Sequence, residues 1–139
     1  MSIAKSLALI LLCCSVSAMA EDSRELVKMP EQMQHHMLSN MRDHLRTIDE
    51  ILLYLSQDKP DKAADVAENR LGMSSLGLHG AAHMAKFMPE QMQTFGTNMH
   101  HAASRFALKA QEGDLLASYK ALREVTASCN ACHSAYRIR

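Results

Sequence analysis

The sequence predicts an all-α protein, an antiparallel up-down-up-down four-helix bundle. Apolar residues make up 47% of the 139 residues, whereas aromatic residues make up 4%, and the chain has only 5 Gly and 3 Pro. Turn-rich β architectures need more of these turn, β-branched and aromatic residues. The 15 Lys and Arg balance the 15 Asp and Glu, which excludes a polybasic nucleic-acid binder.

Residues 1–20 resemble a secretory signal peptide. Lys5 precedes a short apolar stretch that ends in the small-x-small motif Ala18-Met19-Ala20. The stretch is too short to span a bilayer, so we expect no membrane anchor. Cleavage after Ala20 would leave one exported domain, residues 21–139, with Cys129 and Cys132 as its two cysteines.

Helix starts are marked by proline and by one aspartate. Proline suits the first helical turn because the N–H it lacks would be unpaired there, and Asp114 after Gly113 is a probable N-cap. Residues 73–87 are a loop or a short helix that carries His79 and His83. The predicted helices lie near residues 30–56, 60–72, 89–111 and 114–135.

Two patterns refine these helices. The sequence MPEQMQ occurs at residues 29–34 and again at 88–93, as a shared way to start a helix or as the trace of an old duplication. Apolar residues also recur at steps of three and four, which predicts the faces that pack against neighbouring helices. These seams are Met41, Leu45, Ile48, Leu52 and Leu55 in the first helix, and Leu115, Tyr119, Leu122 and either Val125 or Thr126 in the last.

The last predicted helix contains Cys129-Asn130-Ala131-Cys132-His133, which is CxxCH, the attachment motif of c-type haem. At this chain's Cys and His frequencies, a chance match is expected in about 0.6% of such chains. On a helix the two thiols and the imidazole lie on one face. A disulfide in an oxidising compartment is the alternative, but it leaves the adjacent histidine unexplained.

A CxxCH motif at the C-terminus of an all-helical exported chain, followed by Ser134-Ala135-Tyr136-Arg137, resembles the class II c-type cytochromes, the cytochrome c′ family. The resemblance implies a four-helix bundle with one haem c, attached covalently through thioethers at Cys129 and Cys132. It implies His133 as the proximal iron ligand. Arg137 matches the family's basic residue that neutralises a haem propionate, although a solvated cation at a helix C-terminus is equally expected.

The family divides by the sixth iron ligand, which is a methionine of the first helix in a low-spin branch and is absent in true cytochromes c′. Met41 lies on the apolar seam of the first helix, which favours it. In an antiparallel helix pair, His133 is level with about residue 37, so Met37 is the second candidate. A histidine such as His44, or no protein ligand, remains open.

The resemblance implies a periplasmic one-electron carrier with His133 and Met41 as iron ligands. The alternative is a cytochrome c′-type binder of NO or CO with an open sixth position. We expect redox proteins of the periplasm as partners and consider a homodimer, with no nucleic-acid partner. An enzyme is not expected, because no nucleophile–base pair or pair of catalytic carboxylates is recognisable.

Further histidines suggest metal binding only weakly. His79 and His83 could share a metal if their segment is helical, and His100 and His101 with Met99 could form a copper-binding surface. No cysteine or carboxylate completes either set at a diagnostic spacing. Surface or core-edge histidines are therefore the favoured interpretation, and a copper-handling protein that also carries haem is a third hypothesis.

Overall fold

The structure is a computed structural model that describes residues 21–139, so the predicted signal peptide lies outside the described residues. The all-α class is confirmed, and the four predicted helices correspond to α1, α2, α4 and α5. The elements in chain order are β1 (Glu25–Leu26), α1 (Glu31–Ser56), α2 (Pro60–Arg70), the 3-10 helix η1 (Met73–Ser75), α3 (Ala81–Ala85), α4 (Glu90–Gln111), α5 (Leu115–Ala135) and β2 (Tyr136–Arg137).

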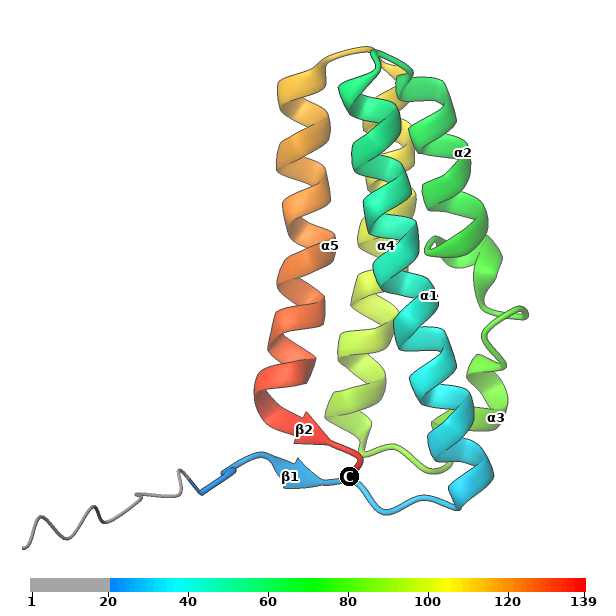
Figure 1. Cartoon of the computed structure of the whole chain (residues 1–139), viewed down its shortest axis with the longest axis vertical. Helices are drawn as coiled ribbons and strands as arrows, with labels where there is room; N and C mark the ends of the chain where they lie inside the picture. The colour runs from blue at the N-terminus through cyan, green and yellow to red at the C-terminus, as the bar shows by residue number, and fades with distance from the viewer. Residues whose placement is uncertain (1–20) are drawn as a thin grey trace, which may run out of the picture.

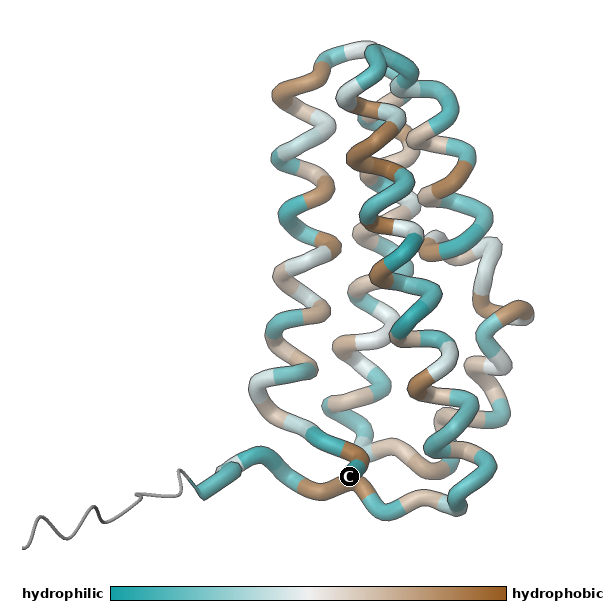
Figure 2. The backbone as a smooth tube through the Cα atoms, viewed as in Figure 1, coloured by the Kyte–Doolittle hydropathy of each residue, from teal (hydrophilic) through white to brown (hydrophobic). Residues whose placement is uncertain are grey.

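The four long helices lie side by side along the long axis of the molecule, and the chain direction reverses from each one to the next (Figure 1). Close packing joins α1 to α2, α2 to α4 and α4 to α5, whereas the described chain shows no comparable packing of α1 on α5. Apolar and polar residues alternate along each long helix (Figure 2). None of the helices in residues 21–139 is long and apolar enough to cross a membrane.

The helix starts follow the predicted signals. Pro60 is the first residue of α2, Pro30 and Pro89 directly precede α1 and α4, and Asp114 caps α5 by accepting a hydrogen bond from the backbone N–H of Ala117. The two MPEQMQ copies also share one side-chain contact. Gln34 donates to the carbonyl of Met29 at 3.1 Å, and Gln93 donates to that of Met88 at 2.9 Å. The repeat is therefore a shared helix-start structure.

The predicted seams are partly correct. Leu55, Leu122 and Val125 are buried, and Met41 and Ile48 pack on core clusters, but four other seam residues are exposed. Leu45 is 72% exposed and Leu52 41% exposed, and in α5 the side chains of Leu115 and Tyr119 are also exposed. The seam prediction assumed a close neighbour on each side, but α1 packs closely only on α2 among the described helices. The buried residues of α1 are Met37, Thr47, Ile51 and Leu55, of which only Leu55 belongs to the predicted seam.

One apolar cluster, which we call the upper core, joins α2 and α4 through small side chains. Alanines at buried positions of both helices let the two backbones approach, because interaxial distance depends on the side chains at the contact. Phe106, Ile51 and Leu71 fill the remaining space. The buried alanines are Ala63, Ala64 and Ala67 of α2 and Ala102, Ala103, Ala107 and Ala110 of α4.

The two chain ends of the described domain meet in a contact that the sequence pattern did not predict. β1 pairs in parallel with β2, with Glu25 opposite Tyr136 and Leu26 opposite Arg137. Tyr136 is extended, which ends α5 after Ala135, and its hydroxyl donates to Gln91 of α4 at 3.2 Å. The segment before α1 therefore lies across the end of α5 (Figure 1).

Candidate functional site

The CxxCH residues lie on the last two turns of α5. Cys129 and Cys132 are free thiols and half-buried, and at spacings of three and four residues they share a helix face with His133. Burial raises the pKa of both thiols, and for Cys132 the nearby Cys129 adds to the rise. His133 is exposed. Two protonated thiols beside an imidazole are the donor set that c-type haem attachment requires.

Cys132 of the motif packs on a cluster that is made mainly of methionine and aromatic side chains, which we call the methionine cluster. Met41 of α1 and Cys132 of α5 both pack against it. Thioether side chains adapt to irregular shapes, so the cluster is a suitable wall for a flat apolar group. Its buried members are Val27, Met29, Met37, Met84, Met92 and Tyr136, and Met33, Met41, Phe87, Met88, Phe95, Cys132, Ala135 and Ile138 pack on them.

The two cysteines face different parts of the interior. Cys129 packs against the upper core, whereas Cys132 packs against the methionine cluster. The CxxCH turn thus spans the boundary between the two apolar regions. Met41 of α1 packs on the same cluster as Cys132.

Arg137 lies beyond the end of α5, in β2. Its Nε is 3.5 Å from the Asp22 carboxylate, and within residues 21–139 this buried nitrogen makes no hydrogen bond. Asp22 is held mainly by Arg24, whose side-chain hydrogen bond lowers the Asp22 pKa to about 2. Arg137 is thus a weakly engaged cation near the methionine cluster, which suits a residue that would meet a propionate.

The remaining histidines do not form the pairs suggested by their spacing. α3 begins only at Ala81, so His79 lies in the preceding turn while His83 is exposed on α3. His100 is buried on α4, and the neighbouring His101 is exposed. The sequence missed a different grouping, because His44, His79 and His100 come together from positions that share no short spacing.

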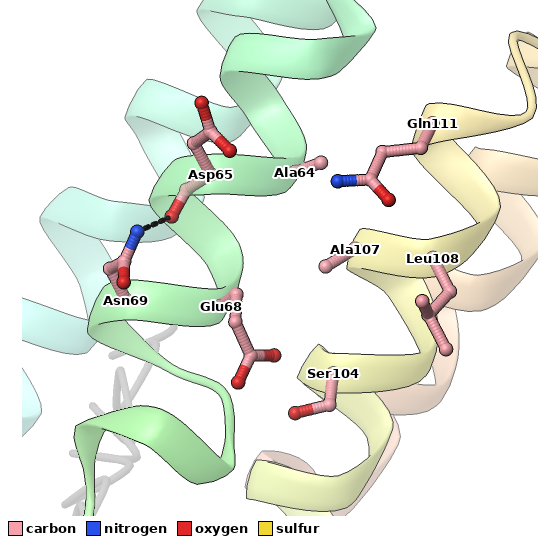
Figure 3. Close-up of a pocket in the computed structure, with 8 residues that line it drawn as sticks. All are labelled: Ala64, Asp65, Glu68, Asn69, Ser104, Ala107, Leu108 and Gln111. Atoms are coloured by element: carbon pink, nitrogen blue, oxygen red, sulfur yellow. Dashed lines mark hydrogen bonds between the residues drawn. The ribbon is translucent and has the colours of Figure 1, made fainter.

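A shallow hollow of about 270 Å³ lies between α2 and α4 (Figure 3). Its acidic residue Glu68 accepts hydrogen bonds from the backbone N–H and the hydroxyl of Ser74. Burial alone would raise the Glu68 pKa, but hydrogen bonds from Ser104 and Ser74 lower it. Glu68 is therefore occupied in fixing η1, and the hollow has no cysteine or histidine in its lining.

An all-helical chain with free, half-buried CxxCH cysteines over an apolar, sulfur-rich face defines a c-type haem protein. Residues 81–137, from α3 to β2, match the family model of cytochrome C′. This C-terminal part of the chain is similar to the cytochrome c′ family, whose members are c-type haem cytochromes. No curated protein and no solved structure matches the chain significantly. The match excludes α1, and hence Met41.

Proposed function

We propose that the protein is an exported, periplasmic one-electron carrier, a four-helix bundle with a single haem c joined by thioethers to Cys129 and Cys132. His133 would be one iron ligand and Met41 the other. The observation that carries the proposal is that Met41 of α1 and Cys132 of α5 pack against one apolar cluster. When bound, the haem iron supplies reversible one-electron chemistry.

The chain's own residues would hold the haem and keep water from it. The thiols of Cys129 and Cys132 provide two anchors on one helix face, and the methionine cluster provides a dry apolar wall. Low polarity around a haem and the identity of its axial ligands set its reduction potential. Arg137 would neutralise a propionate, since its Nε has no hydrogen bond within residues 21–139.

Met41 is favoured over its alternatives by burial and contacts. Met37 is fully buried among other cluster side chains, while Met41 packs on the cluster from outside and is only partly buried. His44 has its ring 4.6 Å from the ring of His79, so it is already engaged with another group. These contacts support Met41 although Leu45 and Leu52, two of the five residues of the seam that first suggested it, are exposed.

Binding of NO or CO at an open sixth position is the second candidate function. The cluster that would line the haem is made mainly of Met and Phe side chains, and an apolar lining with no charged ligand suits a neutral diatomic gas. In that case Met41 would serve as packing, as methionine often does.

Absorption spectra of the purified haem protein and of the Met41→Ala variant test the assignment. Electron transfer with His/Met ligation predicts a low-spin ferric spectrum with a weak sulfur-to-iron band, converted to high spin by Met41→Ala. Met33→Ala is the matched control, since Met33 packs on the same cluster and is also partly buried. A high-spin spectrum in the unchanged protein, or a low-spin spectrum that survives Met41→Ala, would reject Met41.

Partners follow from the same proposal. A carrier in the periplasm would exchange electrons with redox proteins there and would have no catalytic site of its own. Homodimer formation is a further proposal, supported by the exposed leucines Leu45, Leu52 and Leu53 on α1. Sedimentation of the native protein against a Leu45→Glu variant would test it, because a dimer through this face should dissociate in the variant.

A further inference from the structure

Three histidines from distant parts of the chain come together, His44 of α1, His100 of α4 and His79 of the turn before α3. The ring centres of His44 and His79 are 4.6 Å apart, those of His79 and His100 are 5.5 Å apart, and those of His44 and His100 are 6.2 Å apart. His79 is 5% exposed and His100 is 7% exposed. We call these three residues the histidine triad.

Hydrogen bonds at Nδ1 leave Nε2 with a free lone pair in two of the three histidines, His100 and His79. Nδ1 of His100 is 2.7 Å from the carbonyl oxygen of Leu71, so Nδ1 carries the proton and Nε2 keeps its lone pair. The hydroxyl of Ser75 donates to the carbonyl of Gly72 at 2.7 Å. It can therefore only accept from Nδ1 of His79, at 3.4 Å, and Nε2 of His79 is again unprotonated.

The triad has buried polar atoms without partners. Nε2 of His44 and Nε2 of His79 are both buried and form no hydrogen bond within residues 21–139. Buried polar atoms in native proteins are nearly always satisfied by protein, water or an ion. A proton would not suit this place, because burial lowers the pKa of all three histidines, that of His44 to about 4.

We propose that the histidine triad binds one zinc-class divalent metal ion through Nε2 of His44, His79 and His100. Imidazole nitrogen is a preferred ligand of Zn²⁺, and three histidines with one open position are a common coordination set. With Zn–N bonds of about 2.1 Å in tetrahedral geometry, the ring centres would lie about 5 Å apart. The largest adjustment needed is an approach of His44 and His100, which are now 6.2 Å apart.

Ring rotation is part of this binding event. Within residues 21–139 no three His, Cys, Asp or Glu side chains are already arranged to hold a metal ion. The backbone around the triad is nevertheless fixed, because Asn40 and His36 of α1 both contact the carbonyl oxygen of His79 at 2.9 Å. Only side-chain torsions of His44, His79 and His100 need to change.

The charges around the triad allow a cation. The carboxylate of Asp43 acts on His44 and His79 in the direction that favours positive charge. Arg70 of α2 opposes it, but Arg70 is itself bound to Asp43 and to Glu50. Arg46 also pairs with Asp43, at 3.4 Å, so these two carboxylates and two guanidinium groups are neutral overall and do not oppose a buried divalent ion.

Calorimetric titration of the purified, haem-bearing protein with zinc chloride at pH 7.5, after treatment with a chelator, tests the proposal. We expect one equivalent of zinc to bind and the melting temperature to rise with zinc concentration. His79→Ala and His44→Ala should each weaken binding about 100-fold or more, since each removes a ligand. His83→Ala and His101→Ala are matched controls, because both histidines are exposed neighbours of the triad in sequence.

Circular dichroism of each variant separates lost binding from lost folding, and His44→Gln serves as a milder variant if His44→Ala unfolds. The proposal is overturned if folded protein binds no zinc at 100-fold molar excess, or if the exposed controls lose as much affinity as the triad variants. The haem absorption spectrum should stay unchanged throughout. Zinc binding is thus judged independently of the proposed electron-transfer function.

Discussion

Arg24 donates a hydrogen bond from Nη1 to the backbone carbonyl of His133, across 3.4 Å. The two residues are at opposite ends of the described domain, yet this contact and the β1–β2 pairing join them. The last helical carbonyls of α5 would otherwise face solvent. The segment before α1 therefore helps to fix the backbone of the residue that the cytochrome c′ motif assigns to iron.

Residues 25–27, which we call the strap, pair with the backbone of β2. We expect two neighbouring residues of the strap to differ in their effect on stability. Val27 is buried in the methionine cluster, whereas Leu26 is exposed. Val27→Ala should lower the free energy of unfolding by about 1–2 kcal/mol, because it removes buried methyl groups and leaves a cavity. Leu26→Ala should change it by less than about 0.5 kcal/mol. Equal effects in urea unfolding would contradict the strap arrangement.

The CxxCH thiols predict how the haem is held. Replacing both cysteines, Cys129→Ser with Cys132→Ser, should abolish covalent attachment completely, because no free cysteine would then remain in the described residues. Mass spectrometry and haem staining of the denatured chain measure this. The Ser134→Ala variant, altered at an exposed residue next to the motif, is the control and should keep its haem. Covalent haem in the double variant would refute thioether attachment.

Much of the fold could be predicted from local signals. Pro30, Pro60, Pro89 and Asp114 mark the helix starts because each acts within its own first turn. The seam of α1 was only partly correct, because burial depends on neighbouring elements and not on the local pattern alone. Whether Leu45 is buried depends on which neighbour α1 packs against, and the chain packs α1 closely only on α2 among its described helices.

The candidate site also has one part that the sequence predicts and other parts that it does not. The CxxCH motif is contiguous, so Cys129, Cys132 and His133 could be assigned from the sequence. The β1–β2 pairing could not, because two-residue strands have no detectable alternation. The histidine triad could not be predicted from the sequence either. His79 is placed near His44 by a turn in which Gly80 has the left-handed conformation, with φ 61°.

Gly80 leads to a prediction about this turn. A Cβ at this position would lie 3.0 Å from Nε2 of His36, and a left-handed backbone costs a non-glycine residue about 1–2 kcal/mol. Gly80→Ala should therefore lower the free energy of unfolding by that amount and should also weaken zinc binding, because His36 contacts the carbonyl of His79. Gly77→Ala is the control, as a Cβ there meets nothing within 4 Å.

If Gly80→Ala and Gly77→Ala proved equally stable in guanidinium unfolding, the left-handed turn would not be a constraint on the fold. If Gly80→Ala lost stability but kept full zinc affinity, the turn would matter for folding alone, and the positioning of His79 by His36 would be rejected.

The triad histidines predict how stability depends on pH in the metal-free protein. Burial, with the neighbouring His79 and His100, lowers the pKa of His44 from 6.5 to about 4. Between these two values the unfolded chain binds more protons than the folded one, so stability must fall as the pH falls from 6.5 to about 4. For His44 alone the loss is on the order of 3 kcal/mol.

Urea unfolding from pH 7.5 to 4 measures this slope. His44→Gln should flatten the curve, because a side chain that does not titrate removes its proton uptake from both states, while His101→Gln should leave the slope unchanged. Asp43 favours protonation of His44 and limits the loss, whereas His133 opposes it. Since zinc competes with protons for the same lone pairs, saturating zinc should steepen the loss of stability near the pH at which the ion is released. A curve that stays level between pH 6.5 and 4.5 would mean that the triad is already protonated or hydrated in the folded state.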